Sequence, residues 1–113
     1  MDVEWLQKFC GTLPAVTEDI KWGNDLCFSI GGKMFCVAGL NEDLKISFKV
    51  TNDEFEELCS RKGVIPAPYM ARHKWVLAEA AVFKRKEWER HLRQSYELVK
   101  EKLPPKIKKG LPG

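Results

Sequence analysis

Residues 26–38 read LCFSIGGKMFCVA, and this stretch decides the fold. Two runs of mostly apolar residues flank Gly31-Gly32, and a pair of glycines at this spacing favours a tight β-hairpin because glycine accepts positive φ at little cost. The prediction is a hairpin of residues 26–30 and 33–38. A two-residue loop would place three pairs opposite each other: Ile30 with Lys33, Phe28 with Phe35, and Cys27 with Cys36.

The strand pattern continues on both sides of this hairpin. Residues 16–22 alternate with a period of two, and residues 44–50 do the same, with apolar side chains on one face and Lys45, Ser47 and Lys49 on the other. Residues 64–68 must be extended because two prolines each fix their own φ and restrict the residue before them. A further strand is expected at about residues 73–77.

Helical signals lie between and after these strands. Asp2 can cap a first short helix, and residues 51–54 read TNDE, a capping box that opens a second. Apolar residues at helical spacing predict a third helix over residues 86–103, which Pro104-Pro105 ends. The expected class is α+β: an antiparallel sheet of about five strands packed against two to three helices.

Length and composition indicate one domain. A chain of 113 residues with 44% hydrophobic residues can bury one core. We place that domain at residues 1–105 and expect residues 106–113, which hold three lysines, to form a flexible basic tail. Apolar runs are too short to cross a bilayer and the first residues are acidic, so we expect no membrane contact and a cytoplasmic location.

The four cysteines form no C-x-x-C pair and the two histidines lie far from them in sequence. We therefore expect no metal and no cofactor, with the thiols reduced and buried as small hydrophobic groups.

Charge is distributed unevenly along the chain. The net charge is +3, but residues 1–59 hold five lysines and eleven acidic residues, whereas residues 60–113 hold fourteen basic and five acidic residues. The second part could therefore meet an acidic partner or nucleic acid, although folding can interleave the two parts and cancel much of the field.

Four blocks of sequence, in this order, resemble the MmcQ/YjbR family. They are residues 13–16 running into 22–25, residues 31–35, residues 63–69 with Trp75, and residues 95–99 before 103–104. The resemblance implies a fold similar to the frataxin-like CyaY proteins, with an antiparallel sheet flanked by helices. It also implies a double-wing arrangement like that of some DNA-binding proteins, and it brings no catalytic residues.

Six basic residues are candidates for contacts with nucleic-acid phosphates through such wings. They are Lys33, Lys45, Lys49, Arg72, His73 and Lys74. The alternative is that lysines on solvated strand faces keep the sheet soluble and its edges unpaired.

The proline-rich segment offers a second candidate site. Pro66 and Pro68 make it rigid, and Tyr69 and Trp75 could offer flat faces to a base, a peptide or a small ligand. The alternative is a rigid connector whose aromatic residues complete the core.

Enzymatic chemistry is not expected. Cys59 has charged neighbours and His91 lies one helical turn before Ser95, but neither pair has a third orienting group or an oxyanion loop. An iron role is also disfavoured, because the spacing of the acidic residues brings no cluster of oxygens together. We expect a monomeric binding module whose partner is DNA or, alternatively, a protein or small ligand.

Overall fold

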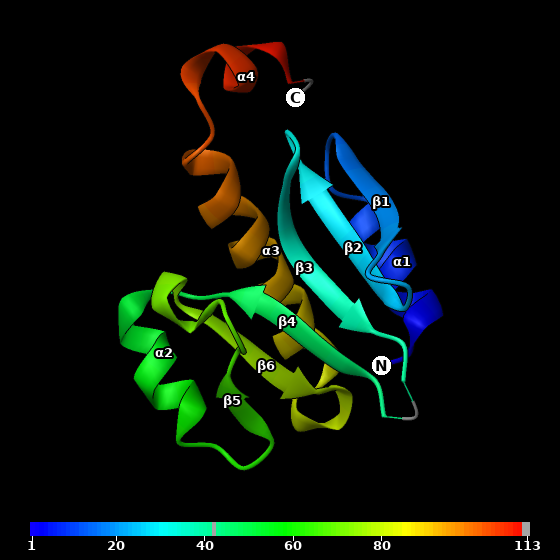
Figure 1. Cartoon of the computed structure of the whole chain (residues 1–113), viewed down its shortest axis with the longest axis vertical. Coiled ribbons are helices and arrows are strands. Elements are labelled where there is room, and N and C mark those ends of the chain that lie inside the picture. Colours follow the sequence, from blue (N-terminus) through cyan, green and yellow to red (C-terminus); the bar gives the residue numbers. More distant parts are fainter. Residues whose placement is uncertain (42, 112–113) are drawn as a thin grey trace.

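The computed structural model describes residues 1–41 and 43–111, and within them a six-stranded antiparallel sheet packs against helices on one side (Figure 1). The strands are β1 (Val16–Lys21), β2 (Asp25–Ile30), β3 (Lys33–Gly39), β4 (Lys45–Lys49), β5 (Val64–Pro66) and β6 (Trp75–Glu79). The helices are α1 (Val3–Gly11), α2 (Asn52–Cys59), α3 (Arg85–Glu101) and α4 (Pro105–Gly110). The strand order is β1-β2-β3-β4-β6-β5.

The α+β class is confirmed, with six strands in place of about five and four α-helices in place of two to three. The proline-rich segment supplies the extra strand, because β5 pairs antiparallel with β6. Glu42, which we expect in a turn, lies outside the described residues, as do residues 112 and 113 of the tail. No helix of the described chain is both long and apolar enough to cross a bilayer.

Helix α3 covers one face of the sheet and builds the core with it. Its side chains at helical spacing are buried as the sequence predicts, and Trp88 and Leu92 are fully enclosed. On the facing strands, Ile46 and Phe48 of β4 are also fully buried. In Figure 1, α3 crosses behind the sheet, so the viewer looks onto the face that α3 leaves open.

The predicted register of the central hairpin is correct only at its tip. Ile30 pairs with Lys33, but Phe28 pairs with Cys36 and Cys27 with Val37, because a β-bulge shifts the register between Phe28 and Ser29. Phe35 is the extra residue of the bulge. The reason is the core: a bulge lets two successive residues turn to one face, and both Phe35 and Cys36 are fully buried.

The bulge also changes which thiols meet. Cys36 lies against Cys10 of α1 in the core, and burial followed by a hydrogen bond with Cys10 raises the pKa of the Cys36 thiol well above its usual value. The predicted pairing of Cys27 with Cys36 across the hairpin is therefore wrong. The sequence does not reveal the bulge, because it contains no glycine or proline at the shifted position.

Strands β3 and β4 separate at one end, and Ser95 of α3 fills the gap. Their ladder runs from Gly39 and Lys45 to Cys36 and Phe48 and stops there. At the next position, the Ser95 hydroxyl donates to the Phe35 carbonyl oxygen at 2.6 Å and accepts from the Lys49 backbone N–H at 2.9 Å. The hydroxyl thus satisfies the two backbone groups that would otherwise pair with each other.

The C-terminal segment lies against the tip of the central hairpin. A Cβ placed on Gly31 would lie 2.7 Å from a Leu103 methyl group and 3.0 Å from one of Ile107 in α4. Gly31 also has φ 58°. The glycine is therefore needed both for the turn and for this close approach. Flexibility of the tail in solution stays a prediction.

Candidate functional site

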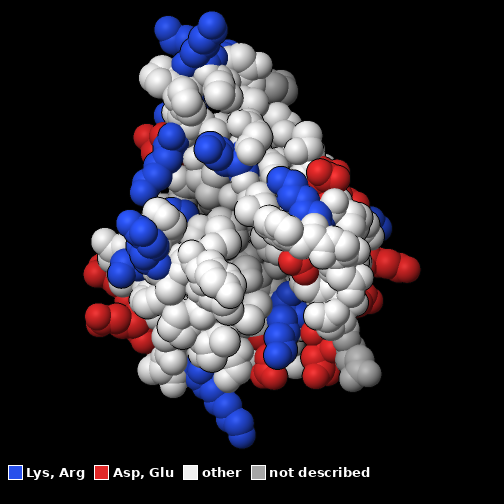
Figure 2. Space-filling view, viewed as in Figure 1, with Lys and Arg blue, Asp and Glu red and all other residues white. Residues whose placement is uncertain are grey.

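The open face of the sheet carries the candidate site. Figure 2 shows uncharged surface over much of this face, hollowed near its middle and bordered by Lys and Arg side chains in its upper part and by side chains of both charges lower down. Two connecting segments contribute side chains to it: the β1–β2 turn at residues 22–24 and the β5–β6 loop at residues 67–74. Between them, residues of β3 and β4 that point away from α3 form the floor.

The first of two grooves on this face is largely apolar, and we call it the aromatic groove. Its volume is about 540 Å³. It is lined by Trp22, Asp25, Met34, Val37, Ser47, Pro68, Tyr69 and Met70. Tyr69 is fully exposed and Trp22 is 70% exposed, which is unusual for side chains of this size.

The second groove lies where β3 and β4 separate, and we call it the lysine groove. Its volume is about 480 Å³. Its lining comes from β3, β4 and β6, from α3 and the residue that follows it, and from the β5–β6 loop: Lys33, Met34, Lys49, Met70, His73, Trp75, Val99 and Lys102. Met34 and Met70 line both grooves, so the two are adjacent and together form what we call the trough.

The lysine groove concentrates positive charge. Lys33, Lys49 and Lys102 line it, and its lining includes no carboxylate. Burial lowers the pKa of Lys49, and the neighbouring positive charge of Lys102 lowers it further. The Lys49 ammonium donates to the carbonyl oxygen of His73, which fixes it in place. A bound anion would relieve the mutual repulsion of these ammonium groups.

Tyr69 is held out by an unusual turn. The Met70 N–H donates to the Ala67 carbonyl oxygen at 3.2 Å, Pro68 occupies the second place, and Tyr69 in the third has φ 65°. This is the pattern of a type II turn, whose third position normally needs glycine. A tyrosine there is strained by roughly 1–2 kcal/mol.

Trp22, which also lines the aromatic groove, likewise has a left-handed backbone conformation. It stands at the end of β1 with φ 52°, directly before Gly23 with φ 82°. For a bulky side chain this left-handed conformation is an outlier. Both exposed aromatic residues of the aromatic groove therefore occupy positions where glycine or asparagine would be more stable.

The six basic residues predicted as a phosphate surface do not all meet. Lys33, Lys49 and His73 come together in the lysine groove. Lys45 lies at the other end of β4, where the hollows that it lines also contain Asp43 and Glu79. Arg72 is exposed on the β5–β6 loop, and the Lys74 ammonium sits 4.9 Å from the centre of the Phe55 ring in α2.

The predicted loop residues divide in a similar way. Pro68 and Tyr69 line the aromatic groove, whereas Pro66 is part of β5. Trp75 borders the lysine groove but is only 4% exposed, so its ring serves mainly the packing of β6. Sequence reasoning missed Trp22, Met34, Met70 and Lys102. Only Trp22 carried a local signal, an aromatic residue directly before a turn glycine.

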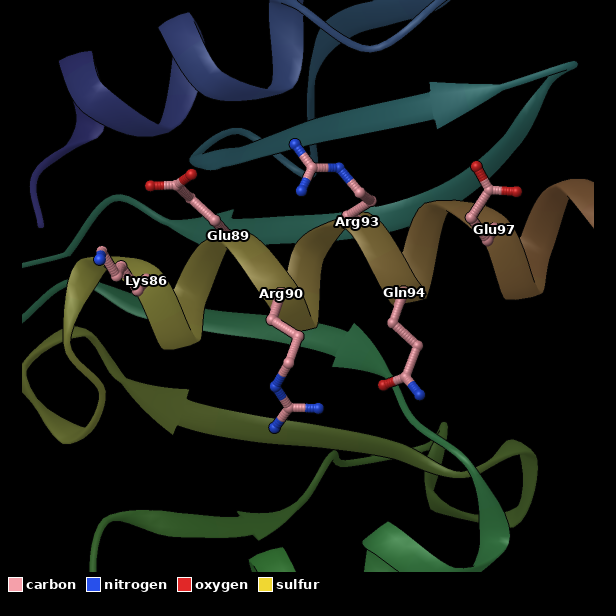
Figure 3. Close-up of a pocket in the computed structure, with 6 residues that line it drawn as sticks. All are labelled: Lys86, Glu89, Arg90, Arg93, Gln94 and Glu97. Carbon is pink, nitrogen blue, oxygen red and sulfur yellow. The ribbon is translucent and has the colours of Figure 1, made fainter.

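Another hollow, of about 490 Å³, runs along the outer side of α3 (Figure 3). Figure 3 shows its side chains in two rows that diverge: Glu89, Arg93 and Glu97 point to one side, and Arg90 and Gln94 to the other. All six lining residues come from this one helix, and their charges nearly balance. The hollow is the space between the two rows.

The residues weighed for catalysis are not among those that line the trough. His91 and Ser95 are 1% and 0% exposed, so both lie inside the core. Burial raises the pKa of the Cys59 thiol, which disfavours the reactive thiolate. In the part of the chain that is described, no three His, Cys, Asp or Glu side chains gather as metal ligands.

Known proteins resemble this chain both in sequence pattern and in fold. The family model described as YjbR matches residues 11–98. A Deinococcus radiodurans crystal structure with the DUF419 domain superposes with a TM-score of 0.86 at 25% identity, covering 97% of this chain and 88% of that one. A structural genomics target from Pseudomonas syringae superposes with a TM-score of 0.74 at 16% identity, covering 87% and 98%. No curated protein matches the sequence.

Proposed function

The chain belongs to the YjbR family, and from this premise we propose that it is a non-catalytic module that binds nucleic acid in the trough on its open sheet face. The observation that carries the proposal is the lysine groove. Three lysines from three different elements converge there, and no carboxylate in the lining neutralises them. Phosphodiester groups are the common biological ligands for such a cluster.

Two features favour binding in the trough over binding by two projecting hairpins, which is what the double-wing arrangement would use. The tip of the β2–β3 hairpin lies against Leu103 and Ile107, so it does not project freely toward a groove of DNA. Lys45, which a wing on the next hairpin would use, has Asp43 and Glu79 beside it. Nearby carboxylates weaken the attraction of a lysine for phosphate.

A salt series with paired variants tests the proposal. Fluorescence anisotropy should show micromolar binding of labelled single-stranded DNA or RNA whose log affinity falls with log salt at a slope of about 2, as expected for roughly three phosphate contacts at about 0.7 each. Lys33→Ala with Lys102→Ala should lower that slope by about 1.4 and weaken binding to every nucleic acid alike.

Lys45→Ala is the matched control, because Lys45 lies on the same open face but outside the trough. It should leave both affinity and slope unchanged. A loss as large as that of the double variant would favour wings over the trough. An absence of binding to any nucleic acid at about 50 mM salt, where screening is weak, would refute the proposal.

A second candidate function rests on the aromatic groove. Two methionines, Val37 and Pro68 give it an adaptable apolar lining of the kind that takes protein side chains. With the lysine groove beside it, this site would suit an acidic segment of a partner protein that carries an apolar anchor residue. Such a peptide therefore belongs in the binding experiments.

A further inference from the structure

We infer that the ligand of the trough is single-stranded nucleic acid, with an unpaired base held between Trp22 and Tyr69 and the adjoining phosphates at Lys33, Lys49 and Lys102. The inference rests on the proposed function and deepens it, since it names the form of nucleic acid and the contact that selects it. The inference depends on the two aromatic residues, because stability does not explain why they occupy their positions.

Both aromatic side chains are exposed at a cost. Trp22 and Tyr69 are the two most exposed of the large hydrophobic residues among those described, and each has a left-handed backbone, with φ 52° and 65°. Neither gains burial in return for this strain. Strained positions of this kind cluster where a side chain must be presented to a ligand.

The two residues reach the aromatic groove from elements far apart in sequence. Trp22 comes from the β1–β2 turn and Tyr69 from the β5–β6 loop, and both line the same groove over a floor that includes Met34 and Val37. Aromatic faces beside a basic surface stack bases of any sequence, because every base offers a π-face. Methionine sulfur against an aromatic ring adds a further contact.

The charged side chains of the trough determine where the phosphate backbone of the nucleic acid would lie. The aromatic groove borders the lysine groove at Met34 and Met70, which line both. A nucleotide with its base at Trp22 or Tyr69 would therefore direct its phosphates toward the three lysines. Asp25 stands at the aromatic end and would repel a phosphate there, which fixes the same orientation.

This arrangement selects single strands over duplex. In a duplex the bases are stacked on their neighbours, so the faces that Trp22 and Tyr69 would contact are already covered. Lysine contacts alone remain open to a duplex. The expected result is that single-stranded DNA or RNA binds at least about tenfold more tightly than a duplex of equal length.

The test uses oligonucleotides of about 12 nucleotides in single-stranded and duplex form, with Trp22→Asn and Tyr69→Asn variants of the full chain. Asparagine tolerates the left-handed conformation, so the variants should keep wild-type thermal stability or exceed it. Each should weaken single-strand binding by about 5- to 100-fold while leaving the salt slope unchanged, because stacking releases no counterions. Ile65→Asn is the control, since Ile65 is 52% exposed but lines a separate hollow with Lys45.

The outcomes separate this inference from the proposed function. Equal binding of single-stranded and duplex DNA, with both asparagine variants unaffected, overturns the single-strand inference and leaves nucleic-acid binding in place. An absence of binding to either form overturns both. Binding of an alternating Glu-Leu peptide that depends on Trp22, without binding of any oligonucleotide, assigns the trough to a protein partner and also overturns both.

Discussion

On the face of the sheet that α3 covers, the large side chains are enclosed, and their spacing in the sequence shows which ones they are. On the open face, two of the largest side chains are exposed on strained backbone and three lysines line one groove. The same strands carry both faces. The covered face has the features of a surface built for stability, and the open face has those of a surface built for binding.

Substitutions confined to one face of the sheet test this division between a face for stability and a face for binding. If the division holds, substitutions on the covered face change the free energy of unfolding and leave the affinity of the folded protein unchanged. Substitutions in the trough do the reverse.

Leu92→Ala should have the largest effect. Leu92 is fully buried under the sheet, so its truncation leaves a cavity and should lower the free energy of unfolding by about 2–5 kcal/mol. Urea denaturation measures the loss. Glu97→Ala on the exposed side of α3 is the control and should change it by less than about 0.5 kcal/mol. A similarly small change for Leu92→Ala would mean that α3 does not pack as described.

Prediction from sequence succeeded where one element carries the whole signal. The faces of β4 and α3 follow from periodicity alone, because apolar residues at spacing two or 3.6 can reach the core together only in one arrangement. The capping box of α2 is equally local, and the Glu54 N–H does donate to the Thr51 hydroxyl at 3.3 Å.

Prediction failed where several elements meet. Lys102 enters the lysine groove from the end of α3, and nothing in its neighbourhood in the sequence links it to Lys33 or Lys49. The bulge at Phe35 places two successive residues, Phe35 and Cys36, in the core, which breaks the period of two on which strand prediction relies. The strain at Trp22 and Tyr69 is a backbone property that composition and spacing do not reveal.

The pH dependence of stability should report on the covered face. Burial, then the neighbouring Arg90 charge, lowers the pKa of His91 to about 4, while Glu54 and Glu87 oppose this and Arg61 adds to it. In the unfolded chain the group has a pKa of about 6.5, so the unfolded state binds the proton first as pH falls. The stability provided by neutral His91 is complete above about pH 6.5 and is lost as pH falls toward 4.

The expected loss is about 2 kcal/mol between pH 7 and pH 5 and about 3 kcal/mol by pH 4. Urea denaturation at a series of pH values measures it. His91→Gln removes the titrating group, so its stability should vary much less from pH 7 to pH 5, whatever its absolute value. Parallel curves for the wild type and the variant would show that His91 takes up its proton in the folded state.

Ser95→Ala should have the smallest effect on stability and should break the division between the two faces. The Ser95 hydroxyl is buried on the covered face, yet it bridges the Phe35 carbonyl oxygen and the Lys49 N–H at the point where β3 and β4 separate. Alanine leaves both groups unpaired, which should lower the free energy of unfolding by about 1–3 kcal/mol. Ser60→Ala is the control, because the Ser60 hydroxyl donates an exposed hydrogen bond to the Glu57 carbonyl oxygen. This substitution should change the free energy of unfolding by less than about 0.5 kcal/mol.

The same substitution should also weaken ligand binding in the trough. Without the hydroxyl, Phe35 and Lys49 can satisfy each other only by closing the gap between the strands, which would narrow the lysine groove that Met34 of β3 and Lys49 of β4 line. Affinity should therefore fall in Ser95→Ala even under conditions where the protein is fully folded, whereas Leu92→Ala of equal or lower stability should keep it. If Ser95→Ala loses stability but binds as the wild type does, the separation of β3 and β4 does not depend on this hydroxyl, and the bulge at Phe35 alone must hold the strands apart.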